Sequence, residues 1–147
     1  MFDWSHDQVE KYVGETPAGS GGLLFLPYLN GERTPNLPNG CGVFHGLKLD
    51  NMTPAHMARA TMEGVTLGLA YGLNRFRELG IAPTEIRLTG GGSKSAVWRQ
   101  LAADIFGVPT ICPTIVRSAS GIGIADDGSE CSGSASPRNF ASPQSTI

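Results

Sequence analysis

The chain has 147 residues, enough for one ordinary domain, and a formal net charge of −2. This charge balance shows no excess of basic residues of the kind that binds nucleic acid. No run approaches the roughly 20 apolar residues needed to cross a bilayer. Its first residues lack the basic and apolar regions of a signal peptide. The three cysteines, Cys41, Cys112 and Cys131, lack C-x-x-C spacing. We therefore expect no disulfide framework, zinc site, nucleic-acid partner or membrane partner, and a cytoplasmic location.

The first third of the chain predicts short elements joined by loops. Residues 2–12 carry apolar side chains between charges, which is typical of a short amphipathic helix. The glycine-rich stretch 14–22 predicts a loop. Residues 23–29 are apolar, but Pro27 limits them to a short or edge strand. Residues 30–35 form a polar loop, and its adjacent Glu32 and Arg33 are expected to be solvated.

Thr53 and Pro54 predict the start of a long helix, with Thr as the N-cap and Pro at the first helical position. We expect it to end near Leu79, with Gly80 just past the end. Ala60, Gly64, Gly68 and Gly72 recur along this helix at every fourth position. Each interior glycine costs about 1 kcal/mol relative to alanine. A stripe of them favours close packing of another element over a ligand contact.

Residues 85–112 predict a strand, a glycine turn, a helix and a second strand. The alternation over residues 85–89 indicates the first strand, Gly90 to Gly92 form the turn, and apolar residues then follow helical spacing to Phe106. Backbone N–H groups at the start of such a helix attract anions, and glycines let a phosphate approach the main chain. Ser93 or Ser95 can cap the helix. The pattern favours an anion site over a tight turn that binds nothing, but it lacks the G-x-G-x-x-G and P-loop spacings.

The remaining residues offer no catalytic set. Cys41 and His45 have no second ligand pair, so we expect no metal site. No carboxylate is paired in a way that indicates a general base. Residues 117–147 are rich in Ser, Gly, Ala, Pro and Asp, and this composition predicts a disordered tail.

Three separated motifs resemble the C-terminal signature of the FGGY carbohydrate kinases. Residues 42–47 (Gly-Val-Phe-His-Gly-Leu) are followed after eight residues by residues 56–63 (His-Met-Ala-Arg-Ala-Thr-Met-Glu). Residues 26–35 and 88–95, together with Trp-Arg-Gln at 98–100, resemble the xylulokinase branch of this family. The motifs occur in the family's order and spacing, over about residues 1–112.

The resemblance implies an α/β fold, namely part of the C-terminal lobe of an actin-like (ribonuclease H-like) ATPase. It implies an ATP-dependent, Mg²⁺-assisted transfer of phosphate to a sugar such as D-xylulose. Gly90, Gly91 and Gly92 would form the turn that meets the nucleotide, and Ser95 would lie near the adenosine. The family's catalytic Asp and sugar-binding residues lie upstream of what corresponds to Met1. We therefore expect no catalytic or metal-binding residue in this chain. We also expect its partner to be the missing N-terminal lobe, and the chain alone to be inactive.

The resemblance stops after Pro113, where the family continues with an acidic residue and a helix of small residues. This chain reads Thr-Ile-Val-Arg-Ser-Ala-Ser-Gly at 114–121. The predicted division is therefore a partial kinase domain over 1–113 and an aberrant low-complexity tail over 114–147, which a shifted reading frame would explain. Two alternatives stay open. The parent is another FGGY kinase, acting on glycerol, ribulose, gluconate or fuculose, or the chain is a non-catalytic nucleotide- or partner-binding module. Independently of these, the parent could form a homodimer.

Overall fold

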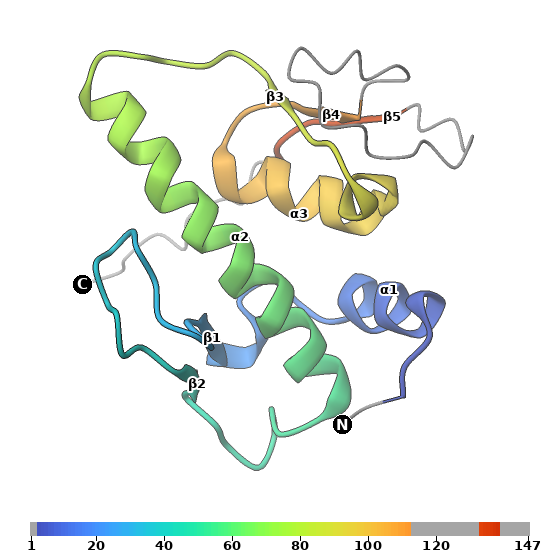
Figure 1. The fold of residues 1–147 in the computed structure, drawn as a ribbon. Coiled ribbons are helices and arrows are strands. Elements are labelled where there is room, and N and C mark those ends of the chain that lie inside the picture. Colours follow the sequence, from blue (N-terminus) through green and yellow to red (C-terminus); the bar gives the residue numbers. More distant parts are fainter. Residues whose placement is uncertain (1–2, 113–132, 139–147) are drawn as a thin grey trace, which may run out of the picture. The chain divides into compact units, whose positions relative to one another are not determined.

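A computed structural model describes residues 3–112 and 133–138 of the chain (Figure 1). Its contacts divide the chain into two compact units, Met1–Ala82 and Pro83–Ile147. The predicted division at residues 113 and 114 lies outside the described residues, as does most of the predicted disordered tail. Among the described residues no helix is both long and apolar enough to cross a membrane.

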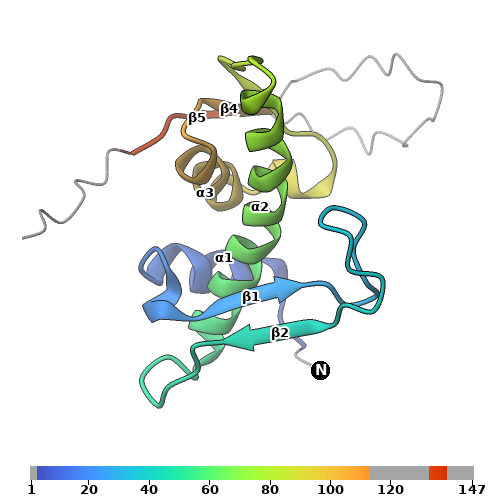
Figure 2. The ribbon, with the colours of Figure 1, turned by 90° about the vertical axis from the view of Figure 1, so that its left-hand side faces the viewer.

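The first unit is an antiparallel strand pair packed on a long helix (Figure 2). Its elements are α1 (His6–Glu15), the 3₁₀ turn η1 (Ser20–Gly22), β1 (Leu24–Pro27), β2 (Gly42–His45) and α2 (Pro54–Glu78). The side chain of Ser5 caps α1 in a capping box with Gln8, and the side chain of Thr53 caps α2. The predicted bounds of α2 are confirmed, whereas α1 lies a few residues later than predicted.

A glycine in α2 allows β1 to lie directly on the helix. A Cβ atom added at Gly64 would stand 2.1 Å from the backbone oxygen of Phe25, a distance that no real side chain tolerates. Leu23, Phe25 and Ala60 form the buried cluster at this contact, with Phe44 packed against it. The predicted role of the small-residue stripe in close packing is therefore confirmed at Gly64.

A buried ion pair on α2 holds α1 and the loop before β1. Arg59 Nε donates to Glu63 Oε1 over 2.6 Å, and both side chains are about nine-tenths buried. Arg59 Nη1 also donates to the carbonyl of Val13 at 2.9 Å, and the Gly19 amide donates to Glu63 Oε1 at 3.1 Å. The pair thus satisfies backbone groups that would otherwise be costly to bury.

The second unit is a small sheet covered by one helix. Its elements are β3 (Ile86–Arg87), η2 (Gly91–Lys94), α3 (Ala96–Phe106), β4 (Thr110–Cys112) and β5 (Gly133–Ala135). The strand order is β3-β4-β5, with β3 and β4 parallel and β4 and β5 antiparallel. The buried residues Leu101, Ala102 and Phe106 of α3 lie on the side that covers β4 and β5. The predicted order of strand, turn, helix and strand is confirmed.

Strand β5 lies within the stretch that was predicted to be disordered, and for residues 133–135 that prediction was wrong. The strand pairs with β4, so its backbone groups are satisfied even though its composition buries little apolar surface. Next to it, Gln100 Nε2 donates to the carbonyl of Ser136 at 2.8 Å. Cys112 takes part in a disulfide bond, which the spacing of the cysteines did not indicate.

Asp104 of α3 binds Arg138, which follows β5. Two guanidinium nitrogens of Arg138 lie 3.0 and 2.6 Å from Asp104 Oδ2, and its amide donates to Oδ1 at 2.9 Å. Burial raises the pKa of the Asp104 carboxyl, but the hydrogen bonds from Arg138 and Gln100 outweigh burial, and the pKa is lowered overall. The ionised aspartate therefore stabilises the docking of this segment.

Alanine at two glycines of the same helix should have opposite effects on stability. Gly64→Ala should lower the free energy of unfolding by about 1–3 kcal/mol, because its Cβ collides with the β1 backbone. Gly68→Ala should raise it by about 1 kcal/mol, because nothing lies within 4 Å of the added atom and alanine favours the helix. Urea denaturation measures both. Equal effects of the two substitutions would contradict the close contact at Gly64.

The Asp104–Arg138 pair should make stability depend on pH. Because the folded-state pKa of Asp104 lies below its ordinary value of 3.8, the contribution is present above that value and is lost as the pH falls through the folded-state pKa. Asp104→Asn should cost about 1 kcal/mol at neutral pH and little in acid. Urea denaturation at neutral pH and in acid, below the folded-state pKa of Asp104, tests this prediction. Glu78→Gln, which breaks an exposed pair with Arg75, is the control and should change little.

Candidate functional site

The candidate site is the glycine turn between β3 and α3. Leu88, just after β3, donates its amide to the carbonyl of Ile111 at 2.8 Å, which fixes the start of the turn. Gly90 then adopts φ +86° and ψ −176°, a backbone conformation that residues other than glycine rarely adopt. The 3₁₀ turn η2 follows, and α3 begins directly after Ser95.

The turn has one open side and one packed side. Gly90 and Gly91 are exposed, and no atom lies within 4 Å of a Cβ added at either. At Gly92 an added Cβ would lie 2.8 Å from the ring of Trp98. The ring of Trp98 lies half-buried against the turn. A ligand can therefore reach the main chain at Gly90 and Gly91, while Gly92 must stay small for internal reasons.

Two side chains hold the turn in shape. Ser93 is 5% exposed, and its hydroxyl donates to the carbonyl of Gly90 at 2.7 Å. Arg99 Nη1 donates to the carbonyls of Ser93 and Lys94 at 2.5 and 3.1 Å. The sequence reasoning missed Arg99. A basic residue in the first turns of a helix opposes the macrodipole, and this conflict was the signal that the residue has a specific partner.

Ser95 is the N-cap of α3, whereas Ser93, the other candidate, is not. The Ser95 Oγ atom accepts the amide of Trp98 at 3.1 Å. A serine hydroxyl can accept this bond and still donate its own hydrogen to a ligand. The first turn of α3 carries no acidic residue, and the exposed Lys94 stands just before it. The positive end of the helix dipole and this cation together favour an anion at the turn.

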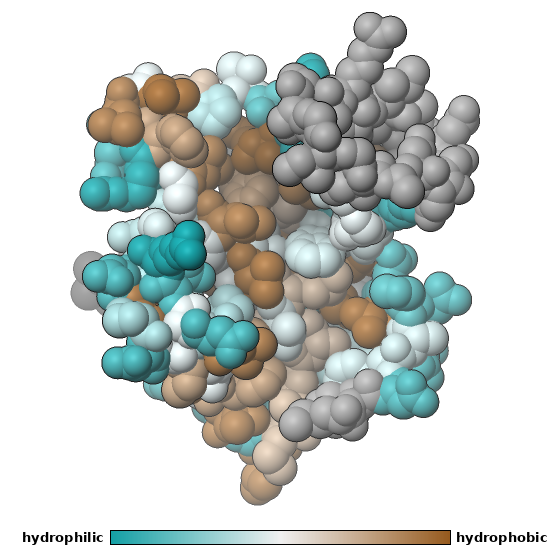
Figure 3. Space-filling model, viewed as in Figure 1, coloured by the Kyte–Doolittle hydropathy of each residue, from teal (hydrophilic) through white to brown (hydrophobic). Residues whose placement is uncertain are grey.

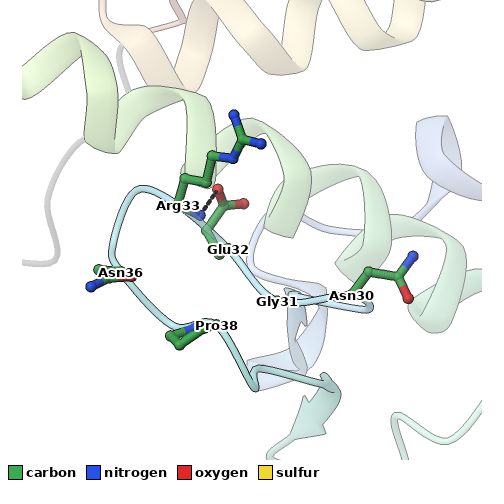
Figure 4. Close-up of a pocket in the computed structure, with 6 residues that line it drawn as sticks. All are labelled: Asn30, Gly31, Glu32, Arg33, Asn36 and Pro38. Atoms are coloured by element: carbon green, nitrogen blue, oxygen red, sulfur yellow. Dashed lines mark hydrogen bonds between the residues drawn. The ribbon is translucent and has the colours of Figure 1, made fainter.

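The loop at residues 30–38 also forms a cavity, of about 460 Å³, lined by Asn30, Gly31, Glu32, Arg33, Asn36 and Pro38. Glu32 Oε1 accepts the amides of Arg33 and Thr34 at 2.7 and 3.2 Å, so this carboxylate stabilises its own loop. Figure 4 shows the side chains of Arg33 and Asn36 leaving the loop in different directions. The polar groups do not converge on one point, and the cavity does not resemble a ligand site.

The described residues contain no group of three or more His, Cys, Asp or Glu side chains able to hold a metal ion. Cys41 is exposed. The ring nitrogen Nδ1 of His56 lies 2.8 Å from the Thr53 hydroxyl at the start of α2. The histidine thus has a structural role at the helix cap.

Comparison with known proteins identifies the family. Residues 5–125 match the family model described as "FGGY family of carbohydrate kinases, C-terminal domain". The chain belongs to the FGGY family of carbohydrate kinases. The match extends past the predicted boundary at residue 113.

Among curated FGGY relatives, the xylulose kinase of Haemophilus influenzae is 41% identical over 106 residues, covering 72% of this chain. The gluconokinase of Bacillus subtilis is 39% identical over 116 residues, covering 78% of this chain. This chain spans only 22% of the length of either relative.

A solved structure supports the same assignment. The crystal structure of xylulose kinase from Bifidobacterium adolescentis superposes with a TM-score of 0.70 at 38% identity, over 76% of this chain and 22% of that one. The described part of the chain therefore has the fold of an FGGY kinase C-terminal domain, which is part of an actin-like ATPase, as the resemblance implied.

Proposed function

We propose that this chain is the nucleotide-binding part of the C-terminal domain of an ATP-dependent sugar kinase. The single observation that carries the proposal is the open glycine turn before α3. Gly90 and Gly91 offer main-chain atoms without a covering side chain, inside a segment that matches a kinase family. The adenine nucleotide is the family's common phosphate donor, so its phosphate oxygens are the anions that the turn would receive.

The turn fits such a ligand in three respects. Gly91 and Gly92 would lie beside the phosphates or ribose, and at Gly91 the absence of a Cβ permits close approach. The hydroxyl of Ser95 would face the adenosine. Arg99 would hold the carbonyls of Ser93 and Lys94 turned away from the ligand, so that amide groups rather than oxygens meet the phosphates.

Binding and catalysis would be divided between this chain and the rest of the kinase. Mg²⁺ is usually held by nucleotide phosphates with one or two carboxylates, and it would neutralise charge on the transferred phosphoryl group. The general base and the sugar-binding residues would come from the N-terminal lobe. The chain by itself would bind nucleotide weakly, transfer no phosphate and, in its parent, act in the cytoplasm.

D-xylulose is the proposed acceptor, and xylulose 5-phosphate the product. The printed names of the relatives favour this choice, since the Haemophilus influenzae and Bifidobacterium adolescentis proteins are both xylulose kinases. Gluconate is the second candidate, because a gluconokinase matches at 39% identity over a longer segment.

Substitution of Gly91 should separate folding from nucleotide binding. Because Gly91 has open space and no positive φ, Gly91→Ala and Gly91→Val should leave the fold intact. Both should weaken ATP binding, and valine should do so by roughly tenfold or more, because its side chain fills the space a phosphate would use. Saturation-transfer NMR with ATP, alongside circular dichroism, measures the two effects. Unchanged ATP binding by a folded Gly91→Val variant would refute the site.

Two chimeric kinases should test which relative's N-terminal part this chain complements, and the better match would favour that relative's acceptor. In one, this chain replaces the matching 106-residue segment of the Haemophilus influenzae xylulose kinase. In the other, it replaces the matching 116-residue segment of the Bacillus subtilis gluconokinase. If this chain comes from a xylulose kinase, the xylulose kinase chimera should retain more of its parent's activity, by roughly tenfold or more, because its domain interfaces would be better matched. A more active gluconokinase chimera would favour gluconate, and two folded but inactive chimeras would contradict kinase function.

A further inference from the structure

Residues 133–138, which we call the β5 segment, lie against the arginine that holds the glycine turn. A Cβ atom added at Gly133 would stand 2.7 Å from Arg99 Nη2 and 3.1 Å from its Cζ atom. The other terminal nitrogen, Nη1, donates to the carbonyls of Ser93 and Lys94 in the turn. A single guanidinium group therefore contacts both the backbone of β5 and the backbone of the turn.

Gly133 is the point of this contact, and its surroundings explain why it is a glycine. Its φ is not positive, so its backbone conformation is open to other residues. Glycine in a strand has no side chain to pack and weakens the strand. The close approach of the Arg99 guanidinium is therefore the physical reason that position 133 carries no side chain.

Helix α3 anchors the β5 segment with two further side chains. Gln100 Nε2 donates to the carbonyl of Ser136 at 2.8 Å and to Asp104 Oδ1 at 2.9 Å. Asp104 also accepts hydrogen bonds from the amide and the guanidinium of Arg138. The helix that carries Arg99 thus holds the far end of the β5 segment, and pairing with β4 holds its start.

Polar contacts, rather than apolar burial, fix the β5 segment in place. Ala135 is the one buried apolar residue among residues 133–138. Large apolar side chains are exposed in the other unit, for example Leu47 and Leu49 on the loop between β2 and α2, which forms the brown lower edge of Figure 3. A segment held by a few hydrogen bonds and a half-exposed ion pair can be loosened by one substitution, so its effect on the turn is measurable.

We propose that the β5 segment positions Arg99, and through it the glycine turn, and thereby strengthens the binding of nucleotide phosphates at Gly90 and Gly91. This inference rests on the proposed function. An arginine side chain has large rotamer freedom, and β5 confines its guanidinium beside the carbonyls that it holds. A turn whose shape is fixed before the ligand arrives binds that ligand more tightly.

The proposed positioning is specific to the sequence of this chain. Residues 133–138 lie beyond residues 5–125, which match the family model. Gly133 and Arg99 are positioning residues in this proposal, because they act on the turn and not on the ligand itself.

Gly133→Ala tests the contact directly. Its methyl group would displace the guanidinium, and the fold should survive because the end of an arginine side chain can move. In ¹H–¹⁵N NMR spectra without nucleotide, the amide resonances of Gly91 and Gly92 should shift. The dissociation constant for ATP should rise roughly threefold or more. Ser134→Ala, a change on the exposed side of β5, is the matched control and should alter neither. A reducing agent in all samples removes any contribution from the disulfide of Cys112.

A double-variant cycle distinguishes positioning from a general loss of structure. In an Arg99→Ala background, Gly133→Ala should have no further effect on the amide resonances or on ATP binding, because the side chain that it displaces is gone. Arg138→Ala is the second variant, since it leaves every residue of the turn in place and loosens the far end of the β5 segment. It should shift the same resonances as Gly133→Ala and also weaken ATP binding.

The two readouts separate this proposal from the proposed function. If Gly133→Ala shifts the resonances of the turn but the chain binds no ATP, the positioning of Arg99 is supported and the nucleotide site is refuted. If ATP binds and Gly133→Ala changes neither the resonances nor the affinity, the positioning is refuted and the nucleotide site stands. Equal effects of Gly133→Ala with and without Arg99 would also overturn the proposal.

Discussion

The absence of a Cβ atom is the constraint on which much of this structure depends. At Gly64 of α2 the carbonyl of Phe25 occupies the space that any side chain would need, and this contact sets β1 on the helix. The buried cluster of Leu23, Phe25 and Ala60 forms around it. Helical propensity alone disfavours glycine at this position, so the packing gain must exceed the propensity cost.

The same constraint shapes the glycine turn, with a different consequence. Gly92 is small because the ring of Trp98 lies against it, which is a structural requirement. Position 90 requires glycine because of its backbone conformation. At Gly91 neither close packing nor backbone conformation requires glycine. A glycine that neither packing nor conformation requires is the position where a ligand contact is the simplest explanation, and this reasoning places the centre of the proposed site at Gly91.

The two units also show how the chain relies on polar contacts where its core is small. The Arg59–Glu63 pair is buried and hydrogen-bonded to the backbone on two sides, so it organises the region around α1. The Asp104–Arg138 pair has one exposed partner and fixes only a local segment. Removing one partner from the buried pair would leave an uncompensated buried charge, whereas water reaches Arg138 and partly screens the Asp104–Arg138 pair.

The sequence by itself determined the elements whose signals are local. The Thr53-Pro54 start of α2, the end of α3 at Phe106 and the order of strand, glycine turn and helix follow from caps and periodicity, and the family followed from motif order. Only the tertiary structure decided that Arg99 holds the turn, that Gly64 and Gly68 have opposite surroundings, and that residues 133–135 add a strand to β4. These features depend on contacts between residues distant in sequence or on what occupies a space, and neither leaves a periodic trace along the chain.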